Sequence, residues 1–367
     1  MLPAPKQSLD PRLGPIRVLT VDDSPLFRTI LRQAFGGLPG VRLVGTGEDG
    51  LEALKLVEEL RPDLMTLDLE MPRLDGLSTL KELRLRDLKV RTIVVSGLNR
   101  RGADKTMQAL ELGAEDFITK PDSSVKGDRV EHLREQLRSM IVRGRAPAPW
   151  QLPKPPVQAL PRPNPVVPSG PRVPATGHSV VLVAVSTGGP RALNEMVQGL
   201  PPDFLGPVLI VQHMPPLFTE SLAERLDKSS HLKAAEARDN EPIKQGRIYL
   251  APGGYHMEVH ASPTGEACIK LHEGPRVNGC RPAADHLFVS AARHYGSRCL
   301  GVVMTGMGCD GTLGARAILQ AGGSCIGQDE STCAVFGMPR MAAEEGLLEG
   351  LYPLPCLAHE INKRTRR

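Results

Sequence analysis

The chain has 367 residues, of which 41% are hydrophobic and 23% charged, and its formal net charge is +4. This length allows two domains with separate cores, and no apolar run approaches the length of a membrane span. The small, dispersed positive charge requires no nucleic-acid partner, and the amino-terminal segment lacks the apolar stretch of a signal peptide, so we expect a cytoplasmic protein without membrane insertion.

In the first third of the chain, apolar β-branched runs alternate with helix-like segments, and each run ends at a polar residue. IRVLTV precedes Asp22 and Asp23, DLMTLD ends at Asp68, TIVVS ends at Ser96 and DFITK ends at Lys120. The alternation predicts a parallel sheet with helices on both faces, in which sites form beyond the carboxyl ends of the strands. Three carboxylates beside a lysine suit a hard cation such as Mg²⁺.

A proline-rich segment follows. Residues 146–175 contain eleven of the 34 prolines of the chain and also Trp150, its only tryptophan. Proline lacks a backbone donor and has a fixed φ angle, so such a segment builds no core and is typical of an extended, semi-rigid linker. The sequence therefore predicts two domains joined by a tether.

After the linker, the apolar run VVLVAV leads directly into Ser186-Thr187-Gly188-Gly189 and a helix that begins near Pro190. A serine on a strand-to-helix turn is either a nucleophile or part of a phosphate cradle formed by backbone N–H groups. The stretch lacks the lysine of a P-loop, and the G-x-S-x-G elbow is also missing.

A serine nucleophile needs a base and an orienting acid. VLIVQHMPP places His213 just after a second apolar run, and VVMTGMGCDG places Asp310 in the loop after a third. All three residues fall at the expected ends of core strands, which allows them to converge. Each also has an ordinary structural interpretation, as a hydrogen-bonded histidine or a helix cap.

The segment around Asp310 supports a rival interpretation. Gly306, Gly308 and Gly311 match G-x-G-x-x-G between a strand and a helix, and Asp329 follows eighteen residues later, as in a dinucleotide fingerprint. Against this, Asp310 lies inside the loop that a pyrophosphate would have to approach, and this strand comes late in the domain. We treat the match as a coincidence.

Two further patterns suggest metal or disulfide chemistry only weakly. HMEVH, from His256 to His260, has the spacing of a zinc-binding histidine pair, but its glutamate is misplaced and its flanks alternate as in a strand. The seven cysteines are odd in number and none form a C-x-x-C pair. We expect a strand at HMEVH and reduced, mostly buried cysteines.

The motifs VDDSP, LDLEMPRLDGL, VVSGL and ITKP together resemble a response-regulator receiver, over roughly residues 15–143. The resemblance implies a flavodoxin-like fold in which Asp68 accepts a phosphoryl group from a histidine kinase. It also implies that Asp22 and Asp23 hold Mg²⁺ together with Asp68, and that Ser96 and Lys120 bind the phosphoryl oxygens.

The second half resembles the catalytic domain of the chemotaxis protein-glutamate methylesterases. The matching stretches are VAVSTGGPRAL, VQHMPPLFTESLAERL, GRIYLAPGGYHMEV, GCRPAADHLFVSAA, VVMTGMGCDG and GQDESTCAVFGMPRMA. Two positions depart from the family pattern. Ala184 and Val185 precede the serine where Gly-Ala is more common, and Cys280 stands where a histidine commonly precedes Arg-Pro.

This second resemblance implies a doubly wound α/β domain that hydrolyses glutamate methyl esters on chemoreceptors, releasing methanol, and that also deamidates receptor glutamines. Ser186 is then the nucleophile, His213 the base and Asp310 the orienting acid. The backbone N–H of Met307 is an oxyanion donor and Thr187 lies near the nucleophile. The esterase reaction requires no cofactor.

Together the two resemblances predict a receiver domain at 15–143, a linker at 144–176 and a catalytic domain at 177–360. We expect a monomer whose partners are a chemotaxis-type histidine kinase and methyl-accepting chemoreceptors. In this family the unphosphorylated receiver is expected to cover the esterase site. Two alternatives remain, a nucleotide- or anion-binding module and a catalytically idle phosphate sink. The sequence does not specify the receptors, the kinase, the output, or the balance of esterase and deamidase activity.

Overall fold

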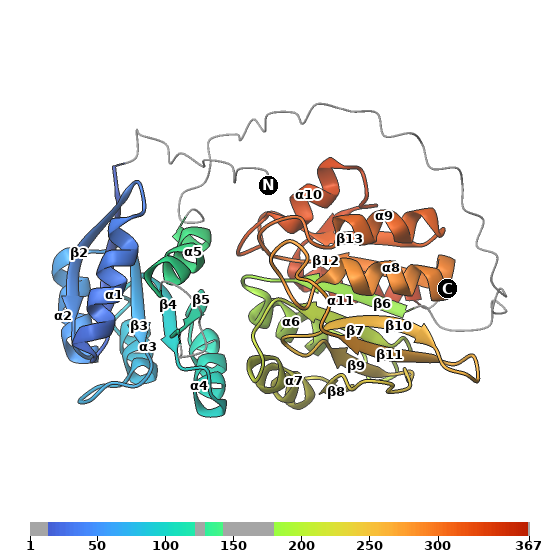
Figure 1. Cartoon of the computed structure of the whole chain (residues 1–367), viewed down its shortest axis with the longest axis horizontal. Coiled ribbons are helices and arrows are strands. Elements are labelled where there is room, and N and C mark those ends of the chain that lie inside the picture. The colour runs from blue at the N-terminus through green and yellow to red at the C-terminus, as the bar shows by residue number, and fades with distance from the viewer. Residues whose placement is uncertain (1–13, 122–128, 142–179, 366–367) are drawn as a thin grey trace.

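The computed structural model describes residues 14–121, 129–141 and 180–365 (Figure 1). Residues 142–179 lie outside the described residues. The linker predicted at 144–176, with Trp150, therefore also lies outside them. Two separate parallel sheets organise the described chain, one on each side of that segment. Within these residues, no helix is long and apolar enough to cross a lipid bilayer.

The first domain contains a five-stranded parallel sheet in the order β2-β1-β3-β4-β5. Its strands are β1 (Ile16–Val21), β2 (Val41–Gly47), β3 (Leu64–Asp68), β4 (Arg91–Ser96) and β5 (Asp116–Thr119). Its helices are α1 (Pro25–Gly36), α2 (Gly50–Leu60), α3 (Gly76–Leu85), α4 (Arg100–Glu111) and α5 (Arg129–Ile141). The predicted α/β fold with a parallel sheet is confirmed.

Local capping explains where these helices begin. The side chains of Ser24, Asp49, Asp75 and Asn99 each accept a hydrogen bond from a backbone N–H in the first turn of the helix that follows. Each of these residues satisfies a donor that the helix itself leaves unpaired. Helices α1 and α5 pack together on one face of the sheet, and α2, α3 and α4 follow one another on the other face. The carboxyl ends of the strands are thereby left open.

The second domain contains a seven-stranded parallel sheet in the order β14-β13-β12-β6-β7-β9-β8. Its strands are β6 (Val180–Val185), β7 (Val208–Gln212), β8 (Lys233–Glu236), β9 (Arg247–Leu250), β12 (Cys299–Val303), β13 (Ser324–Gln328) and β14 (Leu351–Tyr352). A separate antiparallel hairpin consists of β10 (His256–Ala261) and β11 (Ala267–His272). The prediction of a strand at HMEVH is confirmed.

Helices cover both faces of this sheet, which is why its central strands are apolar throughout. They are α6 (Gly189–Gln198), α7 (Phe218–Ser229), α8 (Ala284–Tyr295), α9 (Thr312–Gln320), α10 (Met338–Glu344) and α11 (Leu354–Thr365), with a short 3₁₀ turn η2 (Gly296–Arg298). Along β6, alternate residues enter the two cores: Val181, Val183 and Val185 belong to one, and Val180, Leu182 and Ala184 to the other. A fully buried parallel strand has this pattern.

Two minor expectations from the sequence are wrong. Most of the cysteines are not core residues, since only Cys299 and Cys325 are buried and Cys309 and Cys356 are exposed. All seven are free thiols, as expected. Charge alone suggests that the basic segment INKRTRR is a frayed end, but its residues 361–365 form the last turns of α11, with Ile361 fully buried.

The two domains contact each other through one face of the receiver-like domain. Helix α4 packs against α6 and α7, and the ring of Phe117 on β5 stacks on that of Phe218 in α7, with centroids 4.7 Å apart. Arg100 on α4 forms ion pairs with Glu220 and Glu224 of α7. The edge formed by α4, β5 and α5 therefore faces the second domain (Figure 1).

Candidate active site and phosphorylation site

The polar residues predicted at the strand ends of the first domain are brought together. Asp22 follows β1, Asp68 ends β3, and carboxylate oxygens of Asp22, Asp23 and Asp68 lie within 4.8 Å of one another. Asp22 and Asp68 are buried and Asp23 is exposed, so the cluster opens to solvent on one side. A carboxylate cluster of this kind is typical of a Mg²⁺ site.

Lys120 neutralises part of the negative charge of this cluster. Its Nζ lies 2.6 Å from Oδ2 of Asp68 and 2.9 Å from Oδ2 of Asp22. Burial and the neighbouring Asp22 raise the pKa of Asp68, and Lys120 opposes this. Burial opposes the charged form of Lys120, but the two carboxylates outweigh it and raise the pKa of its ammonium group. Two carboxylates held close together favour binding of a cation.

Ser96 ends β4 and is 2% exposed. It lies beside the start of α4, since a side chain added at Gly102 would come within 2.8 Å of its Oγ. The N–H of Lys120 donates to the carbonyl of Ser96, which fixes the two strand ends side by side. All five residues predicted for this site thus lie along the carboxyl edge of one sheet.

In the second domain, Ser186 follows β6 directly and its backbone is held on all sides. Its N–H donates to the carbonyl of Thr305, and its own carbonyl accepts from the Gly189 N–H at 2.8 Å and from Nε2 of Gln212 at 2.8 Å. Gly188 has a φ of 74°, which a side chain would strain, and this lets the strand turn sharply into α6. The serine side chain is half-buried, and Thr187 beside it is buried.

His213 follows β7, and Asp310 lies in the loop between β12 and α9. Nε2 of His213 is 2.6 Å from Oδ2 of Asp310. The carboxylate of Asp310 also accepts the backbone N–H groups of Ala284 at 2.6 Å and Asp285 at 3.1 Å, at the first turn of α8. The amino terminus of a helix stabilises negative charge, so Asp310 is held ionised and oriented.

The charges of this pair reinforce each other. Burial opposes the charged form of His213, but hydrogen bonds with Asp310 and Cys280 outweigh burial and raise the pKa of the imidazole. Burial likewise acts against the carboxylate of Asp310, yet His213 and the two N–H groups keep its pKa below the ordinary value. Cys280 was recognised in the sequence only as a departure from the family pattern, and the fold places it against the imidazole.

Sheet order explains the convergence of these residues. Strands β12, β6 and β7 are neighbours in the sheet, and Asp310, Ser186 and His213 follow them. Ser186, Thr187 and His213 line a pocket of about 280 Å³, and Asp310 is buried next to His213. The same pocket is lined from the first domain by residues of β5 and α5, among them Phe117 and Met140.

The loop after β12 passes close to the serine. A side chain at Gly306 would come within 2.8 Å of Cβ of Ser186, and the next residue, Met307, is 40% exposed. Thr305 fixes this loop, since its Oγ1 donates to the carbonyl of Thr187 at 2.9 Å and its N–H donates to Oε1 of Gln328 at 3.0 Å. Thr305, Gln328 and Gln212 were missed in the sequence. All three lie inside the recognised motifs, but nothing in the motifs assigns them a role.

The dinucleotide interpretation finds no support in the geometry. Gly308 and Gly311 do have positive φ angles, as such a loop requires. However, the carboxylate of Asp310 is occupied by His213 and α8, and Oδ1 of Asp329 accepts the N–H and hydroxyl of Thr332 within its own loop. A ribose-binding acid has to face the ligand instead.

Comparisons with known proteins place both halves of the chain. Residues 181–361 match the family model of the CheB methylesterases, and residues 18–127 match that of the response regulator receiver domain. The chain is 44% identical over 354 residues to protein-glutamate methylesterase/protein-glutamine glutaminase 2 of Caulobacter vibrioides. This match covers 96% of this chain and 99% of that protein.

Two matches come from Thermotoga maritima. Its protein-glutamate methylesterase/protein-glutamine glutaminase is 42% identical over 342 residues, covering 92% of this chain and 95% of that protein. The crystal structure of the CheB methylesterase catalytic domain from the same organism matches with a TM-score of 0.50 and 41% identity, covering 51% of this chain and 98% of that structure.

Proposed function

The chain belongs to the CheB methylesterases that carry a response-regulator receiver, and from that membership we propose how its own residues perform and control the reaction. The protein is a protein-glutamate methylesterase and protein-glutamine glutaminase of chemotaxis adaptation. One observation carries the assignment of its active site: His213, whose Nε2 lies 2.6 Å from Oδ2 of Asp310, lines the same pocket as a serine on a strand-to-helix turn.

Ser186 Oγ attacks the γ-carbonyl carbon of a receptor glutamate methyl ester while His213 takes the serine proton. The proton returns to the leaving methoxide, methanol departs, and an acyl-enzyme remains. His213 then removes a proton from water, which attacks the acyl carbon, and returns that proton to Ser186 Oγ as the glutamate departs. With a receptor glutamine, ammonia departs in place of methanol. Asp310 holds the imidazole and stabilises its charged form throughout.

Oxyanion stabilisation comes from the loop after β12. The N–H of Met307 is the proposed donor, because the preceding glycine lies against Ser186 and leaves no room for a side chain between them. Thr187 lies beside the nucleophile, and its carbonyl is anchored by Thr305. Donors fixed before the reaction cost no reorganisation when charge develops.

Control resides in the first domain, where Asp68 is the proposed acceptor of a phosphoryl group from a histidine kinase. Asp22, Asp23 and Asp68 fit Mg²⁺, since their oxygens already converge and one side of the cluster is open. Bound Mg²⁺ would neutralise charge on the phosphoryl group during transfer. Ser96 and Lys120 would bond the phosphoryl oxygens, and Lys120 would exchange its present contact with Asp68 for them.

The contact between the domains supports the proposal that the unphosphorylated receiver covers the esterase site. Phe117 and Met140 line the pocket that contains Ser186 and His213, so a receptor helix cannot enter while they stay there. Helix α4, which carries the contact with α7, begins at Arg100, four residues after Ser96. A change at the phosphorylation site is therefore close to the docking surface.

A receiver implies a histidine kinase partner, and the catalytic domain implies chemoreceptor substrates. We propose that the protein acts as a cytoplasmic monomer that uses no cofactor for ester hydrolysis. The anion-binding and phosphate-sink alternatives predict a protein that consumes phosphodonor without releasing methanol.

The deciding experiment is release of radiolabelled methanol from methylated chemoreceptors in membranes, with and without a small phosphodonor and Mg²⁺. We expect release by the intact protein, stimulation by the phosphodonor, and loss of release in Ser186→Ala. Absence of release under all conditions, with normal phosphorylation of Asp68, would overturn the esterase assignment and favour the phosphate sink.

A further inference from the structure

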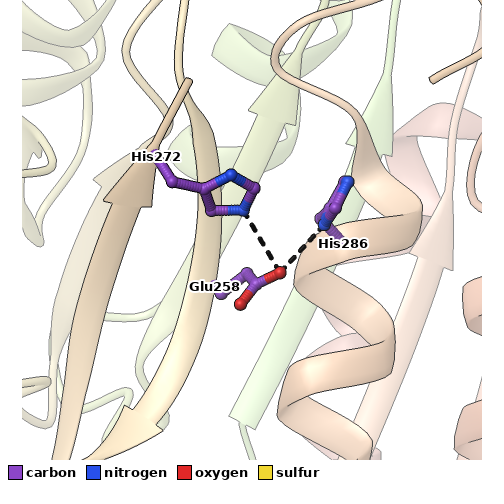
Figure 2. Close-up of side chains that lie close together, drawn as sticks. All are labelled: Glu258, His272 and His286. Atoms are coloured by element: carbon purple, nitrogen blue, oxygen red, sulfur yellow. Dashed lines mark hydrogen bonds and ion pairs between the residues drawn. The ribbon is translucent and has the colours of Figure 1, made fainter. Parts of the chain in front are cut away.

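A cluster of imidazoles around one carboxylate shares none of its residues with the two sites described above. It joins three separate elements: Glu258 on β10, His272 on β11 and His286 on α8. Figure 2 shows the three side chains pointing toward one another. One ligand atom from each lies within 4.8 Å of the others. We propose that these three residues bind a divalent transition-metal ion, with Zn²⁺ as the best fit.

The donor set matches the preferences of zinc. Two imidazole nitrogens and one carboxylate oxygen form a recurring zinc ligand set, with remaining positions taken by water or a fourth side chain. The ligands carry a net charge of −1 when both histidines are neutral, which favours a divalent cation. Mg²⁺ and Ca²⁺ prefer sites made of oxygen ligands only.

The spacing of the ligand atoms is close to that of a coordination shell. Oε1 of Glu258 lies 2.9 Å from Nδ1 of His286 and 3.2 Å from Nε2 of His272. Ligands of a tetrahedral zinc ion stand about 3.3–3.6 Å apart, since metal–ligand bonds are about 2.0–2.2 Å. Small rotations of the side chains suffice to admit the ion between them.

Neighbouring residues hold the ligands in place. Oε2 of Glu258 lies 2.9 Å from Nε2 of His260, which leaves Oε1 for the ion and places a further imidazole beside the site. The ring of His256 packs against that of His286, with centroids 4.1 Å apart. The side chains of the three ligands are 24–32% exposed, so an ion and a water molecule can reach them.

The histidine pair that the sequence suggests is not the pair that the fold selects. His256 uses both ring nitrogens: Nε2 lies 2.9 Å from the carbonyl of Pro275, and Nδ1 accepts the N–H of Ala283 at 3.2 Å. It therefore supports the cluster without binding the ion. The ligands come from segments spread over positions 258 to 286, which is why no short motif reveals them.

Metal binding requires a change of tautomer in both ligand histidines. Nδ1 of His286 donates to Oε1 of Glu258, so its proton moves to Nε2 when Nδ1 binds the ion. Nδ1 of His272 accepts the N–H of Gly274 at 3.1 Å, so the ring proton lies on Nε2 and faces Glu258. When Nε2 binds the ion, this proton moves to Nδ1 and the contact with Gly274 opens. No proton is lost in this exchange of tautomers. Faster hydrogen exchange at the Gly274 amide is therefore expected with bound metal.

The first test measures zinc affinity of the metal-stripped, full-length protein by competition with a chromophoric chelator. Excess Mg²⁺ is present to saturate the carboxylate cluster at Asp68. We expect one equivalent of Zn²⁺ to bind, with at least a hundredfold loss of affinity in Glu258→Gln and in His286→Ala. The exposed residue His231, changed to alanine, is the matched control and should bind as the unchanged protein does.

Glu258→Gln separates a metal site from a structural hydrogen-bond cluster. Its amide oxygen still accepts from the histidines, so the hairpin stays anchored to α8, but the charge that attracts the cation is gone. Normal circular dichroism together with lost zinc binding supports the proposal. Equal affinity and stoichiometry in Glu258→Gln, His286→Ala and the unchanged protein would overturn it.

Cobalt substitution then distinguishes this site from binding to the free cysteines. Co²⁺ bound by two histidines and a carboxylate shows visible d–d bands without thiolate charge-transfer absorption. We expect those bands in the unchanged protein and their loss in His286→Ala. Charge-transfer absorption that persists in His286→Ala would assign the metal to cysteine and refute the proposal.

The stability of the protein gives a further readout. Zn²⁺ at a hundred times its Kd should lower the equilibrium constant for unfolding of the unchanged protein about a hundredfold, but not that of Glu258→Gln.

Discussion

At the scale of single residues, Ser186 is held by its backbone while its side chain remains available in the pocket. Ser186→Ala keeps every one of these backbone contacts and removes only the proposed nucleophile. We expect methanol release to fall by about 10⁴-fold or more, because catalytic triads act as a unit. Adding His213→Ala should cost little further rate. Methanol release near the normal rate in the single variant would contradict the nucleophile assignment.

The environment of His213 predicts a pH dependence. The base must be neutral to accept the serine proton, and its contacts with Asp310 and Cys280 raise the pKa of the imidazole against the effect of burial. The rate should therefore rise with pH through a midpoint above the ordinary histidine value of about 6.5.

The variant Cys280→Ala tests this cause. It removes one group that raises the pKa and leaves the His213–Asp310 pair in place, so the midpoint of the pH–rate profile should move to lower pH while activity is retained. Cys356→Ala, at an exposed position on α11, is the control and should leave the midpoint unchanged. An unmoved midpoint in Cys280→Ala would show that the thiol does not influence the base.

At the scale of secondary-structure elements, the close packing of α8 on α9 holds the end of the Asp310 loop that leads into α9. Gly314 on α9 faces Phe288 on α8, where an added methyl group would meet Cβ of Phe288 at 2.3 Å. Gly314→Ala should therefore separate the helices and destabilise the catalytic domain by about 1–3 kcal/mol. Chemical denaturation of the catalytic domain measures this. Leu313→Ala, 63% exposed on the same helix, should change stability by no more than about 0.5 kcal/mol.

At this scale, the sequence predicts elements better than the contacts between them. Both sheets were predictable because each core strand is an apolar run that ends at a polar residue, as at Asp68 and Ser186. The support of Asp310 by the first turn of α8 was not predictable, because that contact joins segments that are 25 or more residues apart and leaves no local pattern. The helical structure of residues 361–365 was missed because the burial of Ile361 depends on the packing of α11 against β6 and β12.

At the scale of the whole molecule, phosphorylation and ester hydrolysis occupy different domains, which makes them separable. Asp68→Asn cannot accept a phosphoryl group, so stimulation of methanol release by a small phosphodonor should vanish. Basal release should persist, because Asp68 lies outside the esterase pocket. Methanol release that still responds to phosphodonor in this variant would mean that another residue is the acceptor.

The ion pairs between the domains predict the strength of docking. Arg100→Ala removes the two ion pairs that Arg100 forms with Glu220 and Glu224 of α7, although the contacts of Asp104 with Ser221 and of Glu111 with Arg225 remain. Basal methanol release should therefore rise severalfold, toward the level of a fragment that begins near residue 176. A tenfold rise corresponds to only about 1.4 kcal/mol of docking preference. Arg86→Ala is the control, because Arg86 pairs with Glu58 and Glu82 inside the receiver. Equal basal rates in the fragment and the intact protein would rule out the receiver as a cover.

The positions of the triad residues along the chain also determine when the catalytic triad is completed during synthesis of the protein. Ser186 and His213 leave the ribosome early, but the aspartate that completes the triad is 97 residues behind the histidine. At about 5–20 residues per second, a nascent chain carries an incomplete triad for about 5–20 s. The receiver is translated before any of these residues and is able to fold first. Newly made protein therefore acquires its hydrolytic activity only after the domain proposed to restrain it is already in place.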